Sequence, residues 1–129
     1  MEHNTMMHDF DCFPFFKNVI QNKLNEAHQH LKKLELYKYY PELFNVYTLN
    51  DIIDVHEEQN DFINIVYKQC HAWREHARST VQHSQVNTLE EMTRKLETTV
   101  YHILYMVEQI KKIQGMPIDE ENEEASIKQ

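Results

Sequence analysis

The sequence predicts an all-α protein, built as an antiparallel up-down-up bundle of three long helices. The chain of 129 residues contains a single Gly and three Pro, although tight turns between strands need residues that tolerate positive φ. Apolar residues recur every three or four positions along three segments, which is the repeat of one helical face. The Gly and the Pro residues stand where these segments begin or end, so composition and periodicity indicate the same fold.

The first helix is predicted over 14–37, after an N-terminal arm over 1–13. Pro14 suits the first turn of a helix, where its missing N–H is not needed. The apolar stripe that follows consists of Phe16, Ile20, Leu24, Ala27, Leu31 and Leu34. The pattern stops before Pro41, because Pro disfavours the helical conformation of the residue that precedes it. Residues 41–47 are predicted to form a short extra helix.

The second helix is predicted over 49–83, after a capping-box-like start at Thr48, whose hydroxyl oxygen can accept a free backbone N–H. Its apolar stripe is the longest of the three and consists of Leu49, Ile52, His56, Gln59, Ile63, Val66, Cys70, Trp73, Ala77 and Val81. At 1.5 Å per residue this helix is roughly 50 Å long, longer than the first. The end of this helix that extends beyond the first helix can pack against the N-terminal arm or against a second copy of the chain. We expect a homodimer.

The third helix is predicted over 88–114, after a polar connector over 84–87. Thr88 begins a capping box, in which Glu91 holds the reciprocal position. The apolar stripe of this helix consists of Met92, Leu96, Val100, Ile103, Val107 and Ile110. Gly115, which is soon followed by a Pro, is typical of the end of a helix.

The charge and composition exclude several function classes. The net charge is −8, and no part of the chain shows the basic face of a nucleic-acid-binding protein, so direct nucleic-acid binding is not expected. We expect one helical domain over 14–115 and an acidic, disordered tail over 116–129.

No apolar run approaches the roughly 18 residues of a membrane span, and no signal-peptide pattern is present. Two Cys are too few for a disulfide scaffold, which favours a cytoplasmic protein. No cofactor is expected, because no Gly-rich phosphate loop occurs.

Two polar residues, His56 and Gln59, lie on the apolar stripe of the second helix. With residue 37 opposite residue 49, the antiparallel register places His56 level with His30 and close to His28. One interpretation is a buried polar layer that sets the helix register through hydrogen bonds. The alternative is a metal site or a pH-responsive site.

A second level of the bundle is predicted to bring four metal-ligating residues together. Cys12, Cys70, His71 and His102 fall at similar heights in the predicted register. Two thiolates and two imidazoles suit tetrahedral zinc. The alternative is that Cys70, on an apolar stripe, is a small buried hydrophobic residue.

The segment from Arg78 to His83 reads Arg-Ser-Thr-Val-Gln-His. It is similar to the Arg-x4–6-His motif of the HEPN ribonucleases, which are small, helical and often dimeric. The resemblance implies that Arg78 stabilises charge on a phosphodiester and that His83 is a general base or acid. In a continuous helix these positions lie about 140° apart, so this chemistry requires the helix to break between them.

Several aromatic and apolar residues are predicted to point outward. Tyr101 and Tyr105 face away from the stripe of the third helix, and Phe15 and Leu36 lie on the outer side of the first. Tyr pairs on exposed helical faces are typical of interfaces. The leading hypothesis is therefore a non-enzymatic module, such as an adaptor, an inhibitor or an antitoxin or immunity partner, which binds another protein through an outer helical face. A HEPN-like ribonuclease and a zinc-binding bundle are the alternatives.

Overall fold

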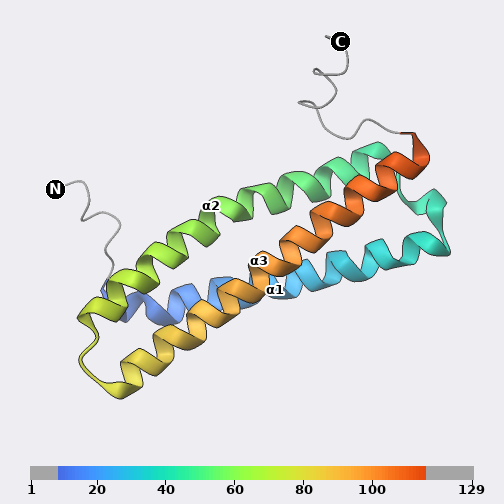
Figure 1. Cartoon of the computed structure of the whole chain (residues 1–129). Coiled ribbons are helices and arrows are strands. Elements are labelled where there is room, and N and C mark those ends of the chain that lie inside the picture. The colour runs from blue at the N-terminus through green and yellow to red at the C-terminus, as the bar shows by residue number, and fades with distance from the viewer. Residues whose placement is uncertain (1–8, 116–129) are drawn as a thin grey trace, which may run out of the picture.

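The computed structural model describes residues 9–115, apart from the side chain of Lys38, and this part of the chain contains three long helices and no strand. The long helices are α1 (Phe13–Glu35), α2 (Val46–His76) and α3 (Thr80–Gln114), and the chain runs up, down and up again through them (Figure 1). Short 3-10 turns occur at η2 (Phe10–Cys12), η3 (Leu36–Lys38) and η4 (Pro41–Leu43). The predicted all-α bundle is confirmed. The predicted tail over 116–129 and the first eight residues of the predicted arm lie outside the described residues.

The connection between α1 and α2 differs from the prediction. The residue that caps α2 is Asn45, whose Oδ1 accepts a hydrogen bond of 2.9 Å from the backbone N–H of Thr48. Thr48 is therefore inside the helix rather than at its cap. The predicted short helix over 41–47 is only the 3-10 turn of η4, and Tyr40 before it has a non-helical backbone, as expected for the residue before a Pro.

The predicted boundary between the second and third helices is wrong. The second helix ends at His76, and Ala77 is extended. The hydroxyl oxygen of Ser79 then accepts a hydrogen bond from the backbone N–H of Gln82, which starts α3. Thr88, the predicted cap, lies within α3, where its hydroxyl donates to the carbonyl of Ser84 at 3.0 Å.

This boundary changes the relative lengths of the helices. The longest helix is α3 with 35 residues, followed by α2 with 31 and α1 with 23. The middle helix is still eight residues longer than α1, as predicted, but it is not the longest helix. The predicted stop at Gly115 is confirmed, because this residue has a φ of 72° and caps α3.

The helix α3 lies against both other helices, whereas α1 and α2 approach each other closely at few places. The buried side chains of α3 are mainly aliphatic: Val86, Leu89, Leu96, Val100, Ile103, Val107 and Ile110. Larger groups fill the space between α1 and α2. At one end the Trp73 ring meets Phe10 and Phe16, each with ring centroids 5.4 Å away. Bulky side chains thus account for the wider α1–α2 separation.

Candidate functional site

A histidine pair joins α1 to α2 nearer the end of the bundle where α1 ends and α2 begins. His30 Nδ1 lies 2.7 Å from His56 Nε2, and the two rings are almost perpendicular. His56 is fully buried and His30 is half-buried, whereas His28 is exposed. The predicted register of these two helices, which placed His56 level with His30, is confirmed.

The direction of each hydrogen bond in this layer follows from its neighbours. Gln59 Nε2 donates to a Glu26 carboxylate oxygen at 3.4 Å, and Gln59 Oε1 faces His56 Nδ1 at 3.2 Å. Because an amide oxygen can only accept, His56 Nδ1 carries the hydrogen and its Nε2 is the acceptor for N–H of His30. The bonds therefore run in one direction, from His30 through His56 and Gln59 to Glu26.

The pKa of His56 is lowered, mainly by the burial of its ring. The hydrogen bond from the ring to Gln59 and the charge of Glu26 raise this pKa, whereas the charges of His30 and Lys23 lower it. The net lowering keeps the ring neutral, which is the state that the bond directions require. His56 is also closed to solvent. These contacts support the interpretation of a register-setting layer, since each inner polar group has a partner.

The structure does not bring the four predicted zinc ligands together. His71 points outward and pairs with Glu75 at 3.4 Å, while His102 lines a groove between α3 and α1. Cys70 is buried, and its burial, reinforced by nearby Glu90, raises the pKa of its thiol to about 11, which disfavours the thiolate that zinc binds. Within residues 9–115, no three His, Cys, Asp or Glu side chains are grouped so as to hold a metal ion.

The misplaced helix boundary explains this correction. Tyr67 donates to Glu97 at 2.8 Å, and Arg74 donates to Glu90 at 2.8 Å, so these pairs set the α2–α3 register. In this register, position 70 lies opposite position 94 rather than near His102. The predicted zinc site therefore depended on an α2–α3 register that differs from the observed register by about two helical turns.

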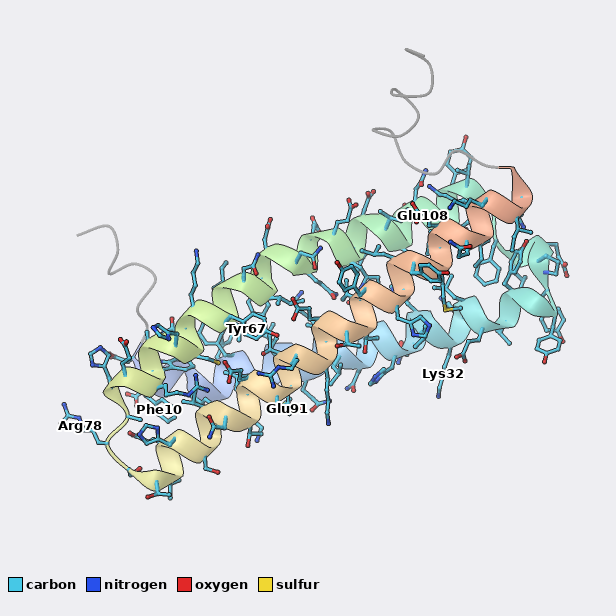
Figure 2. All side chains as sticks on the ribbon, in the orientation of Figure 1. Phe10, Lys32, Tyr67, Arg78, Glu91 and Glu108 are labelled. Carbon is cyan, nitrogen blue, oxygen red and sulfur yellow. The ribbon has the colours of Figure 1, made fainter. Side chains whose placement is uncertain are left out.

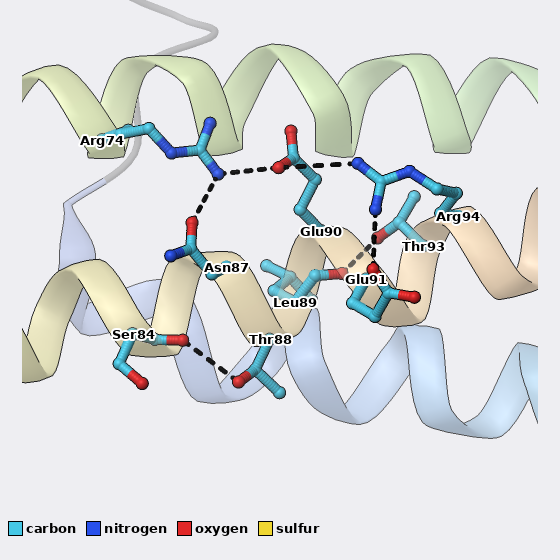
Figure 3. A network of polar contacts seen from close by, with 9 residues as sticks. All are labelled: Arg74, Ser84, Asn87, Thr88, Leu89, Glu90, Glu91, Thr93 and Arg94. Carbon is cyan, nitrogen blue, oxygen red and sulfur yellow. Dashed lines mark hydrogen bonds and ion pairs between the residues drawn. The ribbon is translucent and has the colours of Figure 1, made fainter.

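A network of polar contacts holds α2 and α3 together on the outside (Figure 3). Arg74 also donates to Asn87 at 3.0 Å, and Glu90 accepts an ion pair from Arg94 at 3.8 Å. Arg94 in turn bonds Glu91 at 2.7 Å. Arg74 therefore bridges the two helices, whereas Arg94 pairs within α3, and half-exposed pairs of this kind contribute modestly to stability.

Arg78, by contrast, lies in the connector between α2 and α3, at the end of the bundle that also holds Phe10 (Figure 2). The helix does break between Arg78 and His83, as the HEPN resemblance requires, and both side chains are exposed. A pocket of about 320 Å³ beside the connector is lined by Asp9, Phe10, Trp73, His76, Ala77, Arg78 and Gln82. The imidazole that shares this pocket with Arg78 is therefore that of His76.

The four residues predicted to form a partner surface are exposed but do not form one surface. Tyr101 is 77% exposed and Tyr105 is also exposed, on the outer side of α3. Phe15 lies at the start of α1, and Leu36 lies just beyond its end. Leu36 lies on a surface at one end of the bundle, where several other large apolar side chains of the described chain are also exposed.

That surface, which we call the apolar end, lies where α1 ends, α2 begins and α3 ends. It holds six of the eleven large hydrophobic side chains that are exposed in the described part of the chain: Leu36, Tyr39, Tyr40, Leu43, Tyr47 and Ile113. Of these six residues, only Leu36 was predicted to point outward. The other five could have been suspected from the dense run of Tyr, Leu and Pro between the first two helices, because a connector is ordinarily polar.

A groove of about 1160 Å³ runs along the apolar end, between the last turns of α1 with η3 and the second half of α3. We call it the α1–α3 groove. Its lining consists of Lys32, Lys33, Leu34, Glu35, Leu36, Tyr37, Tyr39, Pro41, His102, Met106, Gln109, Ile110 and Ile113. It exceeds the roughly 300–1,000 Å³ of a small-molecule site, and its walls are mainly apolar. It is thus large enough for a segment of protein.

No protein-family model, curated protein or solved structure matches this chain significantly. None of the helices in residues 9–115 is long and apolar enough to cross a bilayer.

Proposed function

We propose that this protein is a non-enzymatic interaction module, which binds another protein through the apolar end of its bundle. The observation that carries the proposal is the concentration of exposed Tyr, Leu and Ile side chains at the apolar end, where Leu36, Tyr39 and Ile113 line the α1–α3 groove. Large exposed apolar patches on small proteins mark sites of interaction. Tyr and Met are also enriched at protein interfaces.

An adaptor, an inhibitor and an antitoxin or immunity protein all need such a surface and a stable partner. A homodimer that uses the same surface is a further form of the proposal. We place the function in the cytoplasm, because Cys12 and Cys70 are both free thiols and cytoplasmic proteins keep their thiols reduced.

The proposal is tested by recovering partners from an extract of the source cells with tagged full-length protein. Ile113→Asp is the test variant, since this side chain is 72% exposed at the groove. Val81→Asp is the matched control, because Val81 is 66% exposed but lies in the first turn of α3, at the opposite end. We expect wild type and Val81→Asp to retain one stoichiometric partner that Ile113→Asp loses. Equal recovery by all three proteins, or none by wild type, rejects the proposal.

A HEPN-like ribonuclease is the second candidate, favoured by the break of the helix between Arg78 and His83. In this case the guanidinium of Arg78 stabilises the phosphodiester charge and His83 transfers a proton. The test is cleavage of a labelled RNA by wild type, Arg78→Ala and His83→Ala. Activity that both variants lose supports this candidate, and activity that survives in His83→Ala rejects it.

A further inference from the structure

The α1–α3 groove has the form of a helix-binding site. Along α3 its lining residues follow the spacing of one helical face, from His102 through Met106 and Gln109 to Ile113. Across from them, the end of α1 continues into η3, where Leu36 and Tyr39 form the second wall. Two nearly continuous helical walls around an apolar floor match the mode in which an amphipathic helix lies in a groove.

The charges at the groove are opposite to that of the whole chain. The protein carries a net charge of −8, but the charged residues that line the groove are Lys32, Lys33 and Glu35. Both lysines are exposed, and Figure 2 shows Lys32 projecting away from the bundle. Complementary charge at the rim of an interface selects partners and speeds their association.

The lysines also lie in the last turn of α1, where cations interact favourably with the helix dipole. A role confined to the helix end predicts that reversing their charge lowers stability without changing what the groove binds. A binding role predicts a change in the charge preference of the ligand. The two roles are therefore separable by measurement.

We propose that the α1–α3 groove binds an acidic amphipathic helix of a partner protein. This inference rests on the proposed function and specifies the partner. The apolar stripe of the incoming helix packs between Leu36, Met106 and Ile113, and its carboxylates lie beside Lys32 and Lys33. Gln109, which lies between Met106 and Ile113 on the α3 wall, can bond a side-chain amide or hydroxyl of the incoming helix.

The experiment uses three fluorescent synthetic peptides. Two have one helical apolar stripe and carry either Glu or Lys at the polar positions, and the third has the composition of the Glu peptide in scrambled order, without the stripe. Binding to the full-length protein is followed by fluorescence anisotropy at low salt. We expect the Glu peptide to bind about tenfold more tightly than either of the others.

Variants locate the binding. Ile113→Asp is expected to weaken the Glu peptide about tenfold, while Val81→Asp leaves it unchanged. The double variant Lys32→Glu, Lys33→Glu is expected to reverse the preference in favour of the Lys peptide. An unfolding curve of each variant confirms that the bundle is intact. Equal binding of the Glu and Lys peptides, or a preference that the lysine variant leaves unchanged, overturns the inference.

Two other occupants of the groove are outcomes of the same experiment. Residues 116–129 contain five acidic residues and directly follow the end of α3. If the Glu peptide binds only after these acids are replaced by amides, the groove is assigned to residues 116–129, and the proposal of a partner helix is overturned. Self-association that Ile113→Asp abolishes, without peptide binding, assigns it to a second copy and also overturns the inference. If the extract experiment yields a partner while the peptides show no charge preference, this inference fails and the proposed function stands.

Discussion

His30 Nδ1 and His56 Nε2 lie 2.7 Å apart, so an imidazole of α1 and an imidazole of α2 share one hydrogen bond inside the bundle. Only one hydrogen fits between the two nitrogens, and two imidazolium rings at this distance would repel each other. The contact is therefore compatible with a neutral pair or with one added proton. Together with the hydrogen bond from Gln59 to Glu26, this contact links α1 and α2.

The stability of the protein is expected to fall in mild acid through His56. Because burial lowers the pKa of this ring below its ordinary value of 6.5, the unfolded chain binds the proton at a higher pH than the folded chain does. The unfolding free energy therefore does not depend on the protonation of His56 above about pH 6.5. Below this pH it decreases by at most about 1.4 kcal/mol per pH unit. The decrease ends below the folded pKa. Urea unfolding between about pH 7.5 and 5 measures this slope. His56→Gln is expected to reduce it and the exposed-site control His28→Gln to retain it; an unchanged slope in His56→Gln contradicts the assignment.

Removing the His56 ring is expected to destabilise the bundle at neutral pH. In His56→Leu the N–H of His30 and the Oε1 of Gln59 lose their partner, which costs about 1–3 kcal/mol. His30→Ala in the same background tests whether the two rings act together. We expect a coupling of about 0.5–3 kcal/mol between them in a double-mutant cycle of urea unfolding. Additive effects of the two substitutions would show that the bond contributes nothing.

The start of α3 is tested by two caps that the sequence offers. Ser79→Ala removes the acceptor of the Gln82 N–H and is expected to cost about 0.5–2 kcal/mol. Thr88→Ala removes only a bond within the helix and replaces Thr by a better helix former, so its effect is expected within about 0.5 kcal/mol. Thermal or urea unfolding gives both values. The opposite ranking would restore the boundary near residue 88.

The two thiols are expected to react at different rates. Cys70 is buried, and the pKa of its thiol is raised to about 11, whereas Cys12 is half-buried. At mildly alkaline pH an aromatic disulfide reagent should modify Cys12 first and reach Cys70 only when the bundle opens. Cys12→Ser should abolish the fast phase and Cys70→Ser the slow one. Fast modification of Cys70 in the folded protein would contradict its placement.

The fold and the α1–α2 register could be predicted because the apolar stripe of each helix is regular and Pro41 marks the connection. The α2–α3 boundary could not. The stripe of α2 continues in phase through Ala77 and Val81, and both Ser79 with Gln82 and Thr88 with Glu91 satisfy a capping pattern. Tertiary packing decides between them, since Val86 and Leu89 are buried in α3 while Val81 is exposed.

The candidate groove was largely beyond prediction for a related reason. It is formed by residues of α1 and α3, which are distant in sequence, so its lining depends on a register that was wrong by about two turns. The outward position of Leu36 was visible from periodicity alone. Its neighbours, Met106 and Ile113, are found only when α3 is placed correctly.

An odd number of helices separates the two ends of the described chain. Residue 9 lies beside the α2–α3 connector, and residue 115 lies at the opposite end of a helix that spans roughly 50 Å (Figure 1). A dye or a surface tether attached at residue 9 is therefore far from the apolar end, whereas the same group attached at residue 115 is next to it. The choice of attachment point decides whether a binding assay samples the groove open or obstructed.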